Sequence, residues 1–216
     1  LGGKGANLSE MGRMGLPVPP GFTISTKVCE IFYKDKKKLN SKLTNQIKKE
    51  IKKIEKDVSK KFGDLKNPLL LSVRSGARVS MPGMMDTILN LGLNDKTVVA
   101  LANKTSNGRF AKDSYRRFIQ MYGNVVMGVE SYNFEELIEN YKLTKGVLLD
   151  TDLNEEDWDG LIKDFKNVVK EKTSKDFPQD VYHQLFGAIS AVFLSWESKR
   201  AKVYRKLNQI PSEWGT

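Results

Sequence analysis

Apolar residues recur at helical spacing over most of this chain, and the runs typical of strands are short. The first helical pattern covers residues 4–14, and the proline-rich stretch 17–20 ends it because proline cannot continue a helix. Residues 21–24 form a candidate strand, and a helix capped near Ser25 or Thr26 follows. The chain therefore opens with a helix, a turn, a strand and a second helix.

The next stretch predicts one long helix and two strands. Residues 41–61 are rich in lysine and carry apolar side chains at helical spacing, namely Ile47, Ile51, Ile54 and Val58. A continuous apolar run at 69–73 predicts a buried strand that ends at Arg74, and residues 88–93 predict another strand. Mixed helices and strands up to residue 93 favour an α/β (α+β) subdomain.

From residue 94 onward the pattern is helical. The predicted helices cover 95–104, 108–127, 134–145, 155–172, 179–198 and 199–208. Asparagine is a favourable N-cap, and the first four are preceded by Asn94, Asn107, Asn133 and Asn154. Because residues 94–179 hold few glycines or prolines and no convincing strand, we expect an all-helical insertion there. The predicted domains are therefore 1–93, the insertion at 94–179, and a return to the first subdomain at 180–216.

The net charge of +10 raises the question of a polyanionic partner. The lysines gather at 34–38 and 48–61, but the second cluster alternates with the apolar stripe and is typical of the solvated face of an amphipathic helix. No nucleic-acid motif accompanies the lysines, and aromatic residues are not interleaved with them. We therefore expect no nucleic-acid partner.

The single cysteine, Cys29, excludes an internal disulfide framework and is interpreted as a small buried apolar residue in a reducing compartment. No apolar run approaches the length of a membrane span, so no membrane partner is expected. A cytoplasmic location follows as the expectation.

Residues 72–87, SVRSGARVSMPGMMDT, hold the strongest indication of chemistry. Small residues let the backbone approach a ligand and offer bare N–H groups to phosphate oxygens, and Arg74 adds a fixed fork of donors. Residues 1–5, LGGKG, place glycines around Lys4 at the start of a helix, although they lack the glycine spacing and Lys-Ser/Thr pair of a Walker A loop. Together the two segments predict a cradle for nucleotide phosphates.

Both segments resemble one family. LGGKGANLSEMGRMGLPVPPGFTIST and SVRSGARVSMPGMMDTILNLGLND are similar to the N-terminal ATP-binding region of pyruvate, phosphate dikinases. The wider group includes phosphoenolpyruvate synthases and glucan dikinases, and its members share the glycine–lysine start, VPPGF and VRS. The stretch SMPGMMDT followed by LNLGLND narrows the resemblance to the pyruvate, phosphate dikinases. FAKDSYRRFIQMYGNVVMGV and PSEWGT extend the resemblance over nearly the whole chain. It implies a partial ATP-grasp subdomain that is helix-rich overall because of its insertion.

The resemblance also implies roles for particular residues. Lys4 and Arg74 match residues that hold the phosphates of ATP. The loop from Gly83 to Thr87 is expected to cover those phosphates, and its ATP-binding members are Gly83, Met85, Asp86 and Thr87. On sequence alone Arg116 and Arg117, about 100° apart on a helix, are either two surface residues or one outward and one facing a cleft. In the family the residue that matches Arg117 binds inorganic phosphate.

The family reaction is ATP + phosphate + pyruvate to AMP + pyrophosphate + phosphoenolpyruvate, with a histidine as phosphoryl carrier. His183, the only histidine, lies in a helical pattern without the family's phosphohistidine neighbours, so it is expected to be structural or at the surface. The carrier histidine and the Mg²⁺ ligands are expected beyond residue 216, which makes this chain an ATP-binding fragment, inactive alone. Its partners are then the remaining domains of the same polypeptide, in a homodimer, and small-molecule substrates. A phosphoenolpyruvate synthase ATP domain and a non-catalytic binding domain of the same fold remain alternatives.

Overall fold

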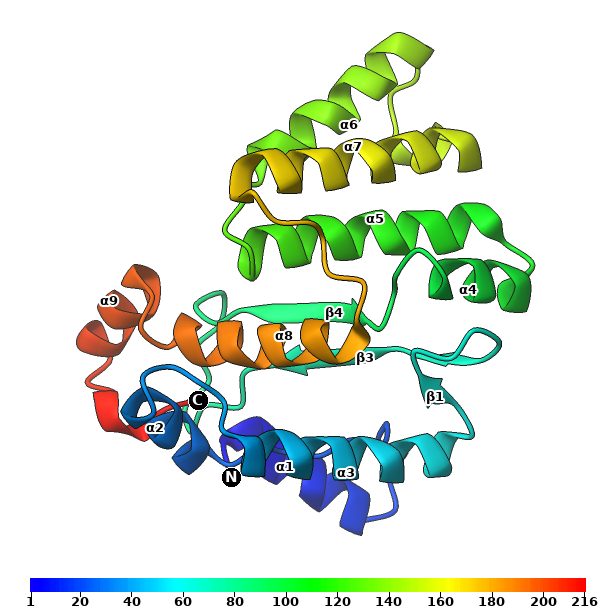
Figure 1. Cartoon of the computed structure of the whole chain (residues 1–216). Coiled ribbons are helices and arrows are strands. Elements are labelled where there is room, and N and C mark those ends of the chain that lie inside the picture. The colour runs from blue at the N-terminus through cyan, green and yellow to red at the C-terminus, as the bar shows by residue number, and fades with distance from the viewer. The chain divides into compact units, whose positions relative to one another are not determined.

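The computed structural model describes residues 1–216, which fold into nine α-helices, two 3₁₀ turns and four short strands (Figure 1). The chain divides into two compact units, each assembled from separate segments. The first unit contains Leu1–Ser59, Val73–Thr87 and Ile189–Thr216, and the second contains Lys60–Ser72 and Ile88–Ala188. The chain passes between the units at four points: after Ser59, within β3 (Leu71–Arg74), at the start of β4 (Thr87–Leu91) and within α8 (Val181–Ser195).

The helices of the first unit are α1 (Gly3–Arg13), α2 (Thr26–Lys34), α3 (Ser41–Val58) and α9 (Lys199–Leu207), with the 3₁₀ turn η2 (Ser212–Trp214). The predicted stripe of α3 is confirmed, because Ile47, Ile51 and Ile54 are buried while the lysines between them are exposed. Asn40 caps this helix by accepting a hydrogen bond from the Leu43 backbone N–H at 2.9 Å.

Two elements of this part differ from the sequence prediction. Residues 21–24 form no strand, because a strand needs a neighbour for its backbone hydrogen bonds and none pairs with this proline-flanked segment. The long helix α3 ends at Val58 rather than near 61, because Ser59 adopts a left-handed conformation with φ of 52°. Lys61–Phe62 instead form strand β1.

The second unit contains β1, β2 (Pro68–Leu69), α4 (Thr97–Thr105), α5 (Gly108–Val125), α6 (Tyr132–Lys145), η1 (Asp150–Asp152) and α7 (Glu155–Thr173). Strands β1 and β2 pair in parallel, and a second two-stranded sheet joins β3 to β4. The apolar run at 69–73 is thus divided between two strands, and β3 alternates between half-buried and exposed residues instead of being fully buried. Only helices and turns lie between residues 94 and 179.

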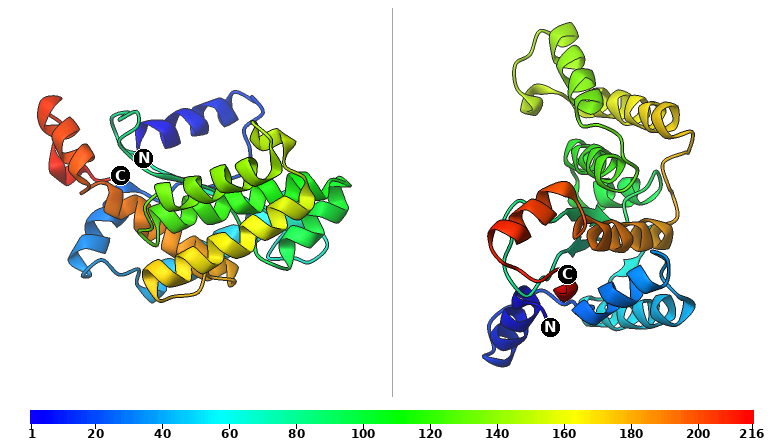
Figure 2. Two further views of the ribbon diagram at one scale, coloured as in Figure 1. Left: turned by 90° about the horizontal axis from the view of Figure 1, so that it is seen from above. Right: turned by 90° about the vertical axis from the view of Figure 1, so that its left-hand side faces the viewer.

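Aromatic packing holds the helices of the second unit together. Helices α5, α6 and α7 lie side by side (Figure 2), and Phe134 of α6 packs on Phe165 of α7 with ring centroids 4.9 Å apart. Trp158 is fully buried in α7. Asn107 and Asn154 are N-caps as predicted. The prediction for Asn94 is wrong, because the N-cap of α4 is Lys96, although the Asn94 side chain accepts from the Lys96 and Thr97 backbone N–H groups.

The prediction that Asn133 is an N-cap is wrong, because that residue lies inside α6, whose N-cap is Ser131. The helical predictions themselves are confirmed, since α4 to α9 follow the predicted patterns to within a few residues. His183 is exposed near the start of α8, and Cys29 is buried in α2. No helix combines the length and the apolar character that crossing a membrane requires.

Candidate functional site

The start of α1 packs directly on the loop that follows β3. The Gly3 backbone N–H donates to the Ala77 carbonyl at 3.1 Å. A Cβ atom on Gly2 would lie 1.1 Å from the Gly76 carbonyl oxygen, and one on Gly3 would lie 3.3 Å from the Arg78 carbonyl oxygen. The first two glycines of LGGKG, Gly2 and Gly3, are therefore explained by backbone-to-backbone packing, which no side chain at Gly2 would permit.

This packing brings two predicted cations to the same part of the first unit. Lys4 extends from the first turn of α1, and Arg74 ends β3 two residues before the glycine of the packed loop. Both side chains are exposed, and neither forms an ion pair or hydrogen bond within the chain. The first backbone N–H groups of a helix lack internal partners and carry partial positive charge. Free cations beside a helix N-terminus are suited to binding phosphate oxygens.

The loop after β3 is fixed to the C-terminal segment of the same unit. The hydroxyls of Ser75 and Thr216 share a hydrogen bond of 2.6 Å, and the Ala77 N–H donates to the Ser75 hydroxyl at 3.5 Å. The Arg78 guanidinium stacks over Trp214 at 5.5 Å from the ring centroid. The segment that receives the start of α1 is thus held on both sides.

Residues 81–87, here called the phosphate-side loop, contain the other four predicted ATP-binding residues. Met81 is buried against Trp196, while Met85 is partly buried on the same cluster. Gly83 is exposed at the loop tip with φ of +70°, a conformation that favours glycine. The Asp86 carboxylate is paired with Arg200, and Thr87 begins β4.

The two neighbouring arginines of α5 lie in different environments. Arg117 points to solvent, with its side chain 62% exposed, and its Nε atom pairs with Asp113 at 3.1 Å. Arg116 is 6% exposed and pairs with Asp113 and Asp150, both at 2.9 Å, while its guanidinium lies 4.4 Å from the centroid of the Trp158 ring. The interpretation of two surface arginines is therefore wrong, because the helix turns Arg116 into a buried ion-pair network.

Lys4, Arg74 and the phosphate-side loop all belong to the first unit, whereas Arg117 belongs to the second. The structure therefore brings six of the seven predicted site residues into one unit. Arg117 is described only by its own surroundings: its Nε atom pairs with Asp113, and its terminal nitrogens form no hydrogen bond within the chain.

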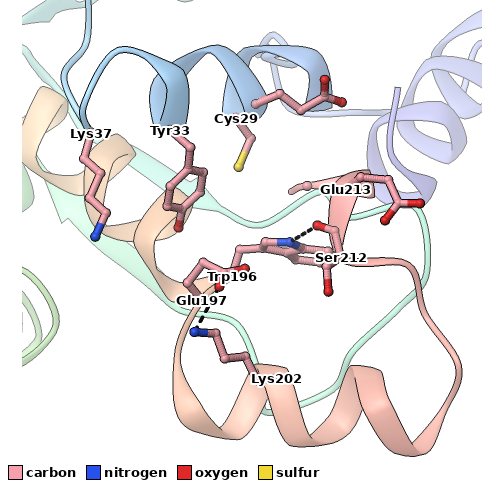
Figure 3. Close-up of a pocket in the computed structure, with 10 residues that line it drawn as sticks. Cys29, Tyr33, Lys37, Trp196, Glu197, Lys202, Ser212 and Glu213 are labelled. Atoms are coloured by element: carbon pink, nitrogen blue, oxygen red, sulfur yellow. Dashed lines mark hydrogen bonds and ion pairs between the residues drawn. The ribbon is translucent and has the colours of Figure 1, made fainter.

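A pocket of about 690 Å³ lies elsewhere in the first unit, between α2, the α8–α9 corner and η2 (Figure 3). Its polar groups bind one another: Trp196 Nε1 donates to the Ser212 carbonyl at 2.8 Å, and Lys202 pairs with Glu197 at 3.0 Å. Tyr33 donates its hydroxyl proton to the Phe193 carbonyl at 2.8 Å. Burial raises the pKa of the Cys29 thiol, so this residue is a packing group and not an activated nucleophile. The pocket contains none of the predicted phosphate-binding residues.

The sequence did not indicate a role for two arginines of α9. Arg200 contacts the phosphate-side loop, and Arg205 is buried beside Trp196 with its guanidinium 4.2 Å from the ring centroid. Both lie in residues 199–208, for which the sequence predicts a helix. Nothing in that pattern distinguishes these arginines from the neighbouring exposed lysines.

Comparisons with known proteins identify the family of this chain. The family model described as "Pyruvate phosphate dikinase, AMP/ATP-binding domain" matches residues 1–44 and 36–216. The chain is 54% identical to the pyruvate, phosphate dikinase of Clostridium symbiosum and 53% identical to that of Rhizobium meliloti (strain 1021), in each case over 100% of this chain. It covers 25% and 24% of those two proteins, so it spans about a quarter of the length of the curated relatives it matches. The chain belongs to the family of pyruvate phosphate dikinase AMP/ATP-binding domains.

Proposed function

We propose that this chain is the ATP-binding portion of a pyruvate, phosphate dikinase. It would hold the phosphates of ATP while a phosphoryl group passes to a histidine that this chain does not contain. The overall reaction converts ATP, phosphate and pyruvate to AMP, pyrophosphate and phosphoenolpyruvate. The observation that carries the proposal is the contact of the α1 start with residues 76–78, which places Lys4 and Arg74 as unpaired cations beside bare backbone.

The roles of the site residues follow from charge and geometry. Phosphoryl transfer depends mainly on positioning and on neutralising charge at the phosphate oxygens. Lys4 and Arg74 offset that charge, and the tip of the phosphate-side loop at Gly83 offers backbone without a side chain. Met85, Asp86 and Thr87 complete the proposed ATP-binding set.

Inorganic phosphate is proposed to bind at Arg117. Its terminal nitrogens form no hydrogen bond within the chain, and a planar guanidinium can give a phosphate two parallel hydrogen bonds. The buried Arg116 keeps Asp113 in place, and Asp113 in turn fixes the Nε atom of Arg117. Arg116 therefore supports the phosphate residue without reaching the ligand.

Magnesium is proposed to accompany ATP, with its ligands outside this chain. Asp86, the carboxylate of the phosphate-side loop, is paired with Arg200. The proposed contribution of this chain to offsetting the phosphate charge is made by Lys4 and Arg74.

The finer assignments belong to the same proposal. They are an ATP-grasp fold, the domain boundaries at 93 and 179, a homodimeric and cytoplasmic complete protein, and partner domains on the same polypeptide. The names of some plant relatives include the word chloroplastic, and that word describes those plant proteins. The relatives named here are dikinases, which favours this function over a phosphoenolpyruvate synthase or a non-catalytic domain.

The test uses the two half-reactions in the complete protein. Lys4→Ala and Arg74→Ala should each raise the barrier of the ATP half-reaction by roughly 2–4 kcal/mol, as for loss of one preorganised charge-stabilising donor. The pyruvate–phosphoenolpyruvate half-reaction should survive, because it does not use the ATP phosphates. Isotope exchange measures each half separately. Equal loss of both halves in a folded variant would refute the assignment.

A further inference from the structure

The phosphate-side loop has few contacts of its own. Its one internal backbone hydrogen bond joins the Met84 N–H to the Met81 carbonyl at 3.1 Å. Met81 is 6% exposed and packs with Trp196, and Met84 and Met85 lie on the same apolar cluster. Met81 therefore anchors the start of the loop, whereas Met84, Met85 and Asp86 are only partly buried and depend also on contacts from outside the loop.

Arg200 supplies two of these outside contacts. Its Nε atom donates to the Met84 carbonyl at 3.1 Å, and a terminal nitrogen of the same guanidinium donates to the Asp86 carboxylate. One planar group therefore binds the loop at two residues, Met84 and Asp86, which flank Met85. Lysine has a single nitrogen and cannot keep both contacts in a fixed relation.

The base from which Arg200 extends is itself rigid. Arg200 lies in the first turn of α9, where the Ser198 hydroxyl accepts from the Ala201 N–H at 3.3 Å. The buried Arg205 ties the same helix to the Trp196 carbonyl and to Glu197. Ser195, before this corner, accepts a hydrogen bond from the Asp86 N–H at 3.4 Å. The loop is therefore attached to a fixed helix corner.

We propose that Arg200 is a positioning residue for nucleotide binding, acting through the phosphate-side loop. Both of its contacts go to the loop, and Asp86 neutralises its charge, so it acts on the nucleotide through the loop backbone at Gly83 to Thr87. This inference rests on the proposed function, because it assigns the loop to the phosphates of ATP.

The first experiment measures the loop without any nucleotide. Arg200→Ala and Arg200→Lys are made in the complete protein, with Lys199→Ala as the matched control, since Lys199 is its exposed neighbour on α9 and has no partner. Dilute peroxide oxidises methionines according to their accessibility, and peptide mass spectrometry follows Met84 and Met85. Met14, already 64% exposed, is the internal reference.

In Arg200→Ala the two loop methionines, Met84 and Met85, should oxidise at least about threefold faster. The two guanidinium contacts that oppose local opening of the loop in the wild type are absent from this variant. Met14 should oxidise at its wild-type rate, and Lys199→Ala should match the wild type at all three positions. Arg200→Lys should lie between, because it restores charge at Asp86 but not the second contact.

The second experiment measures ATP use. The apparent KM for ATP in the ATP half-reaction should rise about tenfold in Arg200→Ala. This lies below the loss of activity, on the order of 100-fold, that a displacement of about 1 Å at a positioned group can cause. The pyruvate–phosphoenolpyruvate exchange should not change. Asp86→Asn should give a related defect, and combining it with Arg200→Ala should add little, because both remove the same contact.

The outcomes separate this inference from the proposed function. Unchanged oxidation of Met84 and Met85 in Arg200→Ala overturns the inference, as does faster oxidation with an unchanged KM for ATP. The proposed function fails independently if Lys4→Ala and Arg74→Ala leave the ATP half-reaction intact. Faster oxidation together with a raised KM for ATP, and recovery of part of both effects by lysine, supports the positioning role.

Discussion

Gly2→Ala tests the packing of α1 on the loop after β3 with the smallest possible change. The added methyl group would lie 1.1 Å from the Gly76 carbonyl oxygen and 2.3 Å from its carbonyl carbon. Ordinary contacts between such atoms lie at about 3.5 Å, so the helix start and the loop must separate by roughly 2 Å. The hydrogen bond from Gly3 to Ala77 cannot survive that separation.

Gly2→Ala should therefore affect both the stability of the protein and its use of ATP. Loss of one backbone hydrogen bond and local repacking should lower the free energy of unfolding by about 1–3 kcal/mol. The larger effect should fall on ATP, because a displacement of only about 1 Å can cost on the order of 100-fold when it moves a positioned group such as Lys4. We therefore expect the ATP half-reaction to fall about 100-fold or more, with the pyruvate half-reaction retained.

Two glycines of the same helix provide graded controls. A Cβ on Gly3 would meet the Arg78 carbonyl oxygen at 3.3 Å, a mild contact, whereas one on Gly12 would meet nothing within 4 Å. Gly12→Ala should leave ATP use unchanged and stabilise the helix by up to about 1 kcal/mol. Half-reaction rates and thermal unfolding are measured for all three variants. Wild-type ATP kinetics in Gly2→Ala would refute the packing argument.

Two further predictions concern α5. In the complete protein, Arg117→Lys should raise the apparent KM for inorganic phosphate more than the apparent KM for ATP, because lysine keeps the charge but loses the planar fork. Steady-state kinetics with each substrate varied measures both constants, and equal changes would exclude the phosphate role. Arg116→Ala should lower the free energy of unfolding by about 3 kcal/mol, because it leaves Asp113 and Asp150 without their buried partner and uncovers Trp158. Denaturant unfolding measures this loss, and a loss comparable to that of Arg117→Ala would contradict the burial argument.

The sequence predicted those features that depend on local spacing. The apolar stripe of α3 and the caps Asn107 and Asn154 follow from residues within one or two helical turns, so pattern alone was sufficient. Asn133 fails because a capping residue is defined by where its helix begins, and the helix begins earlier, after Ser131. The strand expected at 21–24 fails because strand formation requires a partner that the segment itself does not specify.

Long-range partners set the limit for the candidate site. Arg200 and Asp86 are 114 residues apart in sequence, and Arg116 and Asp150 are 34 apart, so no spacing rule could pair them. Lys4 and Arg74 were recognisable because glycines and small residues surround them, which is a local sign of close backbone approach. The glycines that allow a contact were therefore visible in the sequence, whereas the side chains that stabilise one were not.

The two sides of the site consequently differ in how they tolerate substitution. On the α1 side the contact is between backbones, so any side chain at Gly2 must displace a carbonyl group, whatever its chemistry. On the α9 side the contact is made by one exposed guanidinium, so its loss removes two hydrogen bonds without forcing atoms apart. The first kind of change moves the helix that carries Lys4, and the second releases only the loop from Met84 to Asp86. A defect in ATP use should therefore be larger for Gly2→Ala than for Arg200→Ala, and lysine should restore function in part only at position 200.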